Sequence, residues 1–249
     1  MDTRNPCEKL ATLQRHDKSF GMADAYINGL VANLTLDKKI HIGYYPVFPE
    51  VHLSLTVRTS SASDPGPLFA EACQAIEQSL GEVIYGRDQD SLASITGQLL
   101  KDHHPQLAVA ESCTGGLLGQ LVTRVAGSSS YFLGGVIAYA NSMKTEYLDV
   151  SEQLLASHGA VSREVAAAMA VGVMNRSKAD IAVAVTGLAG PGGGSKEKPV
   201  GTVYISVATK STVHTQHFQF VGNRAQIQKI TAKTALDLVR QYLLKQNGS

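Results

Sequence analysis

Polar and apolar positions along the first third of the chain predict a helix, a hairpin and a second helix. Apolar residues first recur at helical spacing and then alternate with polar ones over residues 40–57, so two antiparallel strands with one face in water are expected. Pro67 suits the start of a second helix and Gly81 its end. Residues 1–18 have no clean period, which indicates a flexible N-terminus. The pattern therefore predicts a small α+β domain over residues 19–87.

From residue 88 onward, short apolar strands alternate with helical segments. The expected strands cover residues 107–110, 132–139, 180–186, 200–209 and 213–220, and the expected helices begin at Asp90, after Gly116, and at Asn141, Ser162 and Asn223. The runs 107–110 and 180–186 are typical of fully buried strands, and the last two strands can pair as antiparallel neighbours. Strands and helices mixed in this way favour a three-layer α/β/α domain with a mixed sheet over residues 88–249.

The composition of the 249 residues is that of a folded globular protein, with 44% hydrophobic and 17% charged residues. A formal charge of +1 and the absence of a basic run disfavour nucleic acid and membrane surfaces as partners. Cys7, Cys73 and Cys113 are odd in number and widely spaced, so neither a disulfide framework nor a cysteine metal site is indicated. With no signal sequence and no apolar run of roughly 18 residues, a cytoplasmic protein is expected.

The stretch LAVAESCTGGLL, residues 107–118, joins a buried strand to a helix. This junction places the Ser112 hydroxyl beside N–H groups around Thr114, Gly115 and Gly116, which the first turn of a helix leaves unpaired. Such a junction is typical of an oxyanion or phosphate site. Alternatively, Ser112 or Thr114 only caps the helix, and the glycines form a tight turn.

A glycine-rich loop at residues 187–194 follows the second buried strand. Because glycine has no side chain, the loop can bring backbone N–H groups close to a ligand. An ordinary flexible loop is the alternative. The loop lacks the lysine and Ser/Thr ending of a Walker loop, so nucleoside triphosphate chemistry is not expected.

Five motifs that follow one another along the chain resemble the C-terminal domain of the CinA family, namely AESCTGG, AYANSMK, HGAVS, TGLAGPGGG and KPVGTVY. The resemblance covers about residues 90–249, and stand-alone versions of that domain are nicotinamide mononucleotide deamidases. Residues 20–86, with FGMADAYI and YYPVFPEVHLSL, resemble the KH-like domain that precedes it in full-length CinA proteins. The family's large N-terminal domain, associated with ADP-ribose pyrophosphatase activity, has no counterpart in this sequence, so that activity is not expected.

The resemblance implies that a serine and a lysine hydrolyse the carboxamide of nicotinamide mononucleotide, without cofactor or metal. Ser112 matches the nucleophile and Lys144 the general base, while Tyr139 is expected to orient Lys144 or to relay a proton. Arg224 resembles an arginine near that position in the family and is the candidate for the phosphate. The implied substrate-binding residues are Thr114, Gly115, Gly116, Asn141, Gly187, Gly190 and Arg224. Family members are usually oligomers, so a homo-oligomer is expected.

Each of these roles has an alternative interpretation. Lysine takes a proton from serine only when its amine is neutral, which requires burial or nearby positive charge to lower the pKa from about 10.4. A solvated lysine is the alternative for Lys144, and a surface side chain is the alternative for Arg224. Cys113 is a rival nucleophile, although a buried cysteine is usually inert. His158 would suit a Ser-His-acid hydrolase, but no G-x-S-x-G elbow is present.

A second hypothesis places the chain in another class, as a catalytically decayed nucleotide-binding or regulatory module linked to competence and DNA damage. Retention of Ser112, Lys144, the double glycine and the glycine-rich loop favours the enzyme. The KH-like part has no G-x-x-G between two helices and no basic face, so nucleic-acid binding through it is not expected.

Overall fold

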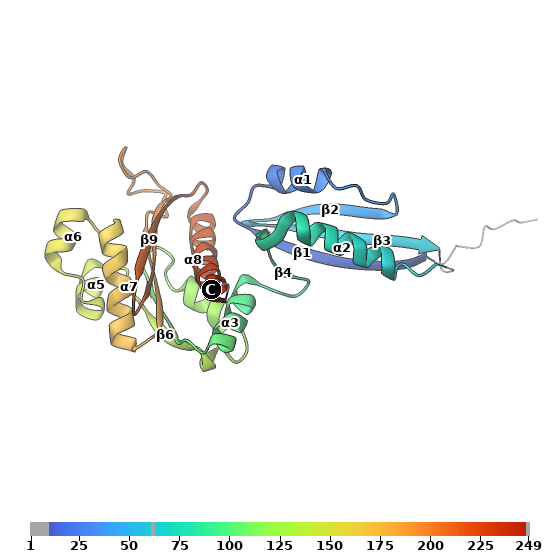
Figure 1. Ribbon diagram of the computed structural model, residues 1–249. Coiled ribbons are helices and arrows are strands. Elements are labelled where there is room, and N and C mark those ends of the chain that lie inside the picture. Colours follow the sequence, from blue (N-terminus) through green and yellow to red (C-terminus); the bar gives the residue numbers. More distant parts are fainter. Residues whose placement is uncertain (1–9, 61–62, 248–249) are drawn as a thin grey trace, which may run out of the picture. The chain divides into compact units, whose positions relative to one another are not determined.

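The computed structural model describes residues 10–60 and 63–247. They form two compact units that divide between Asp90 and Ser91, whereas the sequence pattern places the boundary after residue 87. Each unit has its own sheet and its own helices (Figure 1).

The first unit is an antiparallel sheet packed against two helices. Its strands are β1 (Leu10–Phe20), β2 (Ile40–Val47), β3 (Glu50–Ser60) and β4 (Ile84–Arg87), in the order β2-β3-β1-β4, and its helices are α1 (Asp24–Ala32) and α2 (Gly66–Leu80), followed by the 3-10 turn η1 (Gly81–Val83). Ile27 of α1, Leu53 and Leu55 of β3 and Ile76 of α2 are fully buried in the core of this unit. The predicted α+β arrangement is confirmed.

Two expectations for this unit are wrong. From Leu10 onward the chain forms β1 rather than a flexible N-terminus, and residues 1–9 lie outside the described residues. The polar residues of β1 hide its strand period, because Asp17 is fully buried beside Arg15. The hairpin also lacks the expected solvent-exposed face on β3, since the polar residues Ser54 and Thr56 of this strand are buried.

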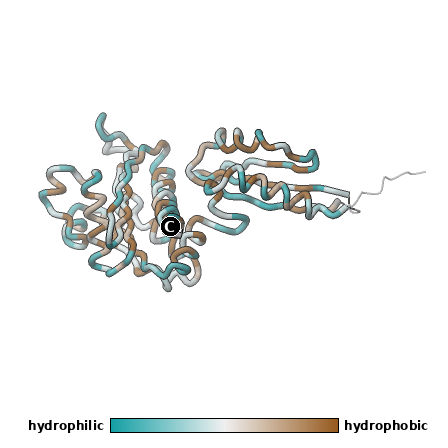
Figure 2. The backbone as a smooth tube through the Cα atoms, viewed as in Figure 1, coloured by the Kyte–Doolittle hydropathy of each residue, from teal (hydrophilic) through white to brown (hydrophobic). Residues whose placement is uncertain are grey.

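The second unit is built on a mixed five-stranded sheet in the order β6-β5-β7-β8-β9. Its strands are β5 (Leu107–Glu111), β6 (Phe132–Ile137), β7 (Ile181–Gly187), β8 (Thr202–Thr209) and β9 (Val213–Gln219). β5 runs parallel to β6 and β7, while β8 is antiparallel to β7 and β9 is antiparallel to β8. All of β5 and all but the last residue of β7 are buried, as their apolar sequences require. Figure 2 shows hydrophobic and hydrophilic segments alternating along the chain in both units.

Helices cover both faces of this sheet. They are α3 (Leu92–His103), α4 (Leu117–Thr123), α5 (Asn141–Leu148), α6 (Glu152–His158), α7 (Arg163–Ser177) and α8 (Arg224–Asn247), with the 3-10 turn η2 (Ser128–Ser130). α5 and α6 pack on α7, which lies across one face, and α3 and α4 pack with α8 on the other (Figure 1). The three-layer α/β/α fold with a mixed sheet is therefore confirmed.

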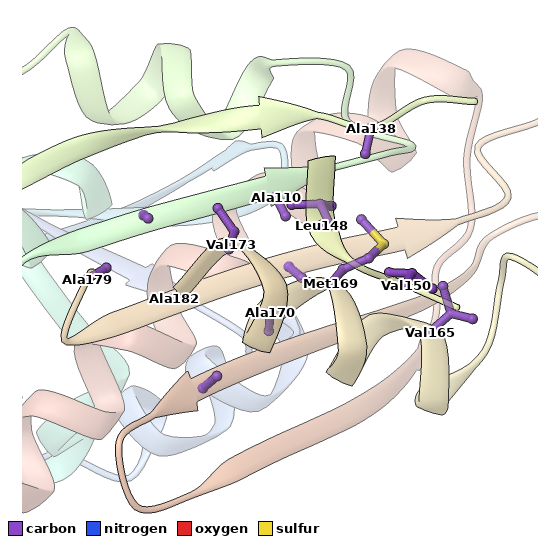
Figure 3. Packing of buried hydrophobic residues seen from close by; sticks show 13 residues of the cluster. Ala110, Ala138, Leu148, Val150, Val165, Met169, Ala170, Val173, Ala179 and Ala182 are labelled. Carbon is purple, nitrogen blue, oxygen red and sulfur yellow. The ribbon is translucent and has the colours of Figure 1, made fainter. Parts of the chain in front are cut away.

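Apolar side chains of α7 pack directly on the sheet. Figure 3 shows Met169, Ala170 and Val173 of α7 packed toward Ala110 of β5 and Ala182 of β7, and all five are buried. The packing of α7 on the sheet in turn determines where α5 can lie, because α5 packs on α7. The core thus sets the position of the helix that carries Lys144.

Two helices of this unit depart from the sequence expectation. α3 is capped by Ser91 rather than Asp90, because the Ser91 hydroxyl accepts from the N–H of Ser94 and the Ser94 hydroxyl accepts from that of Ser91. The Asp90 carboxylate instead accepts from the N–H of Arg87 in the preceding turn. The short helix α6 was not expected at all; its N-cap is Ser151.

Candidate active site

Ser112 follows β5 directly, at the edge of the sheet where three parallel strands end. Its N–H donates to the carbonyl of Val185 in β7 at 3.0 Å, which continues the β5–β7 pairing by one residue. Because β5, β6 and β7 are parallel, the residues after each of them meet at this one edge. The sequence around Ser112 therefore lies beside the residues that follow Ile137 and Gly187.

Lys144 reaches the same edge from α5 and lies next to Ser112. Its Nζ is 3.2 Å from Ser112 Oγ, 2.8 Å from the carbonyl oxygen of Ala138 and 3.1 Å from that of Tyr139. The side chain is only 1% exposed, and this burial lowers the pKa of the amine below its usual value. A solvated lysine, the alternative reading of the sequence, is thus wrong for Lys144.

The three contacts of the Lys144 amine suit a proton acceptor. A neutral amine has two hydrogens and one lone pair. If both hydrogens go to the carbonyls of Ala138 and Tyr139, the lone pair is directed to the hydroxyl of Ser112. The arrangement can therefore accept the Ser112 proton without any side-chain movement.

Hydrogen bonds to a main-chain carbonyl and to one carboxylate hold the turn from Ser112 to Gly116. The N–H of Gly115 donates to the Ser112 carbonyl, and that of Gly116 to Glu111 Oε2 at 3.0 Å. These two N–H groups are consequently occupied, and the expectation that they would bind an oxyanion is wrong. The reading in which Ser112 or Thr114 caps the helix is also wrong, because the N-cap of α4 is Gly116, at φ 103°, with no side-chain cap.

Thr114 and Cys113 occupy the interior of this turn. Thr114 is 3% exposed, and its Oγ1 has no hydrogen-bond partner among the described residues. Burial raises the pKa of the Cys113 thiol to about 12, so the reactive thiolate is scarce at neutral pH. Gln228 Nε2 donates to the Cys113 carbonyl at 2.9 Å, which fixes the plane of the peptide that carries the Thr114 N–H. Cys113 is therefore a poor rival to Ser112 as nucleophile.

A cavity of about 190 Å³ opens on Ser112 and Lys144. Its lining includes Ser112, Cys113, Tyr139, Lys144, Gly187 and Arg224, together with Ala160, Val161, Thr186 and Ala189. The last four had no predicted role, although the HGAVS and TGLAGPGGG motifs contain them. Asn141 is exposed and absent from this lining, and Thr114, Gly115, Gly116 and Gly190 are absent from it as well.

Tyr139 and Arg224 form one hydrogen-bonded unit at the cavity. Arg224 Nη2 donates to the Tyr139 hydroxyl at 2.9 Å, and Nη1 donates to the carbonyl of Gly190 at 2.8 Å. It is thus the main-chain carbonyl of Tyr139, not its phenol, that contacts Lys144. The phenol orients Arg224 instead, and the carbonyl of Gly190 holds the same guanidinium.

The wall formed by Ala160 and Val161 is held by two side chains, one from β7 and one from the segment between the glycine-rich loop and β8. Thr186 Oγ1 donates to the Ala160 carbonyl at 2.7 Å. Lys198 Nζ donates to the carbonyls of Val161 at 2.8 Å and His158 at 3.0 Å. β7 and the chain that follows it thereby hold the Ala160–Val161 wall of the cavity.

Other hydrolytic arrangements find no support in the described part of the chain. His158 is half exposed, lies outside the cavity lining and has its Nδ1 3.5 Å from Glu164 Oε2. Within residues 10–60 and 63–247, no three His, Cys, Asp or Glu side chains gather as metal ligands would. Over the same residues, no helix combines the length and the apolar character needed to cross a membrane.

Two family models match most of this chain. Residues 89–243 match the CinA C-terminal domain, and residues 14–86 match the KH domain of the damage-inducible protein CinA. A CinA-like protein of Desulfotalea psychrophila is 50% identical over 236 residues, which is 95% of this chain and 57% of the relative. A putative competence-damage inducible protein of Moorella thermoacetica is 47% identical over 79% of this chain and 48% of its own length. The chain thus spans about half the length of the curated relatives it matches.

Solved structures resemble a part of the chain. The competence/damage inducible protein CihA from Agrobacterium tumefaciens aligns with a TM-score of 0.58 and 40% identity, over 59% of this chain and 91% of that one. The competence damage-inducible protein A (ComA) from Klebsiella pneumoniae aligns with a TM-score of 0.60 and 31% identity, over 61% of this chain and 95% of that one.

Proposed function

The chain belongs to the CinA family, and from this premise we propose that its second unit converts nicotinamide mononucleotide and water into nicotinic acid mononucleotide and ammonia. The observation that carries the proposal is the contact between the buried Lys144 amine and the Ser112 hydroxyl. Hydrolysis of an amide requires a strong nucleophile, a base that activates it and donors for the oxyanion. The pair supplies the first two.

The reaction begins with attack of Ser112 Oγ on the carboxamide carbon. As the Oγ–C bond forms, the neutral Lys144 amine takes the hydroxyl proton and becomes an ammonium. The carbonyl π electrons move to oxygen, so a tetrahedral oxyanion results. The same ammonium then gives its proton to the amide nitrogen. The oxyanion re-forms the C=O bond as the C–N bond breaks and its electrons leave with nitrogen, so ammonia departs and an acyl group stays on Ser112.

Water completes the cycle by the same route. Lys144, neutral again, takes a proton from a water molecule that attacks the acyl carbon, and then returns this proton to Ser112 Oγ as the ester bond breaks. The products are the carboxylic acid and the free serine. Apart from water, no further reactant, oxidant or reductant is needed.

The donors for the oxyanion come from the peptide groups next to Ser112. The N–H groups of Gly115 and Gly116 are occupied, which leaves those of Cys113 and Thr114. Neither donates to another residue in the described part of the chain, and Gln228 fixes the Cys113–Thr114 peptide. Of the two residues only Cys113 lines the cavity, so we assign the oxyanion to the N–H of Cys113.

The size and charge of the cavity suit the reacting end of the substrate. A volume of about 190 Å³ is below the roughly 300 Å³ at which pockets begin to enclose whole ligands. The pyridine carboxamide therefore enters the cavity, and the ribose phosphate lies toward Arg224, whose guanidinium is exposed and oriented by Tyr139 and Gly190.

Ammonia and nicotinic acid mononucleotide released by purified wild type, Ser112→Ala and Lys144→Ala test the proposal. Wild type is expected to turn over, and each variant to lose about 10³-fold or more in kcat because both residues act in one unit. Ser157→Ala and Lys229→Ala, two exposed positions outside the cavity, serve as matched controls and should match wild type. Retained turnover in Ser112→Ala would discard the mechanism, and a wild type that binds the nucleotide without turnover would favour a binding module.

A further inference from the structure

Glu111 is the last residue of β5, and its carboxylate lies inside the turn that carries Ser112. Oε2 accepts from the N–H groups of Gly116 and Leu118, both at 3.0 Å, and Oε1 accepts from that of Gly119 at 2.8 Å. The side chain is 2% exposed. Because Glu111 precedes Ser112 and its partners follow it, the carboxylate ties both ends of the turn together.

The main chain of Glu111 reaches the other half of the pair. Its carbonyl accepts from the N–H of Ala138 at 2.7 Å. The Ala138 carbonyl in turn accepts from Lys144 Nζ at 2.8 Å. One residue thus connects the turn that holds the nucleophile to the peptide that holds the amine.

The surroundings of this carboxylate are shaped for an anion. In the described residues no Lys, Arg or His forms an ion pair with Glu111, so three backbone donors provide its hydrogen bonds. Space around it is limited, because a Cβ added at Gly119 would lie 3.4 Å from Oε1. Glu111 takes no part in the chemistry above and does not line the cavity.

We propose that Glu111 is a positioning residue for the Ser112–Lys144 pair, acting through the three N–H groups that its carboxylate holds. The proposal rests on the proposed function and adds a residue to it. Fixed geometry matters here because a misplacement of about 1 Å at reacting atoms can cost on the order of 100-fold in rate.

Glutamine in place of Glu111 has the same shape but cannot hold the same donors. The amide has one oxygen, and its NH₂ group would face a backbone N–H where a second oxygen is needed. Glu111→Gln is therefore expected to lower kcat by about 100-fold and to leave KM within about twofold, because Glu111 does not touch the cavity. Glu111→Asp keeps the charge at a shorter reach and should lose about tenfold in kcat.

The experiment measures kcat and KM for ammonia release in the full chain, with the melting temperature of each variant. Glu152→Gln is the matched control, because Glu152 is an exposed carboxylate in the first turn of the equally short helix α6. In Glu111→Ala, added sodium formate should raise kcat in a saturable way by filling the vacated carboxylate position. Sodium chloride at equal ionic strength should not.

A wild-type kcat in Glu111→Gln would overturn the proposal. It would also be overturned if the loss of kcat in the variants matches their unfolded fraction and formate does not raise kcat in Glu111→Ala. If Glu111→Gln and Glu111→Ala do not fold, Glu111→Asp decides by the same split between kcat and KM, and wild-type kcat there overturns the proposal.

Labelling of Ser112 by an alkyl fluorophosphonate separates this proposal from the proposed function. If wild type releases no ammonia but is labelled, the proposed substrate is wrong, and slower labelling of Glu111→Gln than of wild type still supports the positioning role. Equal labelling rates would overturn that role. A wild type that shows neither reaction overturns both, because an unreactive serine leaves no pair to position.

Discussion

The buried amine of Lys144 is subject to two opposing effects. The carbonyls of Ala138 and Tyr139 favour the charged form, since an ammonium donates to them more strongly than a neutral amine. Removal from water disfavours that form, and it is the larger effect, because the pKa of Lys144 is lowered. The balance leaves the amine oriented by the carbonyls and available as a base, with Ser112 as its third neighbour.

Tyr139→Phe separates the two contacts that Tyr139 makes. The phenylalanine keeps the main-chain carbonyl that holds Lys144, but removes the hydroxyl that orients Arg224. A hydrogen bond to a charged group contributes about 1.5–3 kcal/mol, and Tyr139 is exposed, so the lower end applies. We expect KM for nicotinamide mononucleotide to rise roughly tenfold with little change in kcat, as measured by steady-state ammonia release.

Tyr147→Phe is the matched control for this variant, because Tyr147 is an exposed tyrosine on α5 outside the cavity. A large loss of kcat in Tyr139→Phe with unchanged KM would instead assign the phenol to proton transfer, against the role inferred from its contact with Arg224.

Single residues of the site differ in how far the sequence predicts them. Ser112 and Lys144 come from ordered motifs, and the structure places their side chains in contact. The role of Glu111 could not be read from the sequence, because caps are expected from residues that precede the helix directly or lie in its first turn. Glu111 instead lies at the end of a strand and reaches forward over the turn. Thr186 and Ala160 are joined by tertiary contact alone.

At the scale of elements, the position of α5 depends on a glycine in α7. A Cβ added at Gly172 would overlap the carbonyl oxygen of Leu148, the last residue of α5. Gly172→Ala must therefore push the two helices apart, which overpacks the core and should lower the free energy of unfolding by about 2–3 kcal/mol. Because α5 carries Lys144, kcat should fall as well. Urea denaturation and ammonia release measure the two effects.

Gly29→Ala tests whether the effect is specific to that contact. Gly29 also lies within a helix, α1, but a Cβ there meets no atom within 4 Å. Alanine has the higher helix propensity by about 1 kcal/mol, so this variant should be as stable as wild type or more so, with unchanged activity. Equal stability of Gly172→Ala and wild type would contradict the close packing of α5 on α7.

Helices and strands whose apolar residues form a clear pattern could be predicted from the sequence, and the others could not. β5 and β7 agree with the expected ranges within one residue at each end, and α5 begins at the expected Asn141. The sequence pattern does not predict β1, because a buried ion pair places charged residues such as Asp17 inside the sheet. These charges interrupt the alternation of apolar residues that marks a strand. α6 spans only seven residues, too few for a helical stripe to stand out.

At the scale of the whole molecule, every residue of the proposed reaction lies in the second unit. Ser112, Lys144, Tyr139 and Arg224 all follow the division at Asp90 and Ser91. The chain from Ser91 to Ser249 should therefore fold alone and keep the full kcat. Circular dichroism and ammonia release by this fragment check the expectation. A folded but inactive fragment would show that the first unit contributes to the site.

The pH dependence of kcat/KM for ammonia release tests most directly whether a neutral Lys144 activates Ser112. Only the unprotonated amine accepts the serine proton, so the rate should rise with pH and level off once Lys144 is neutral. Because burial lowers the pKa of Lys144 from 10.5, the rise should have its midpoint below that value. A kcat/KM that stays flat or falls as the pH rises toward 10.5, or that rises only at or above pH 10.5, would contradict the account.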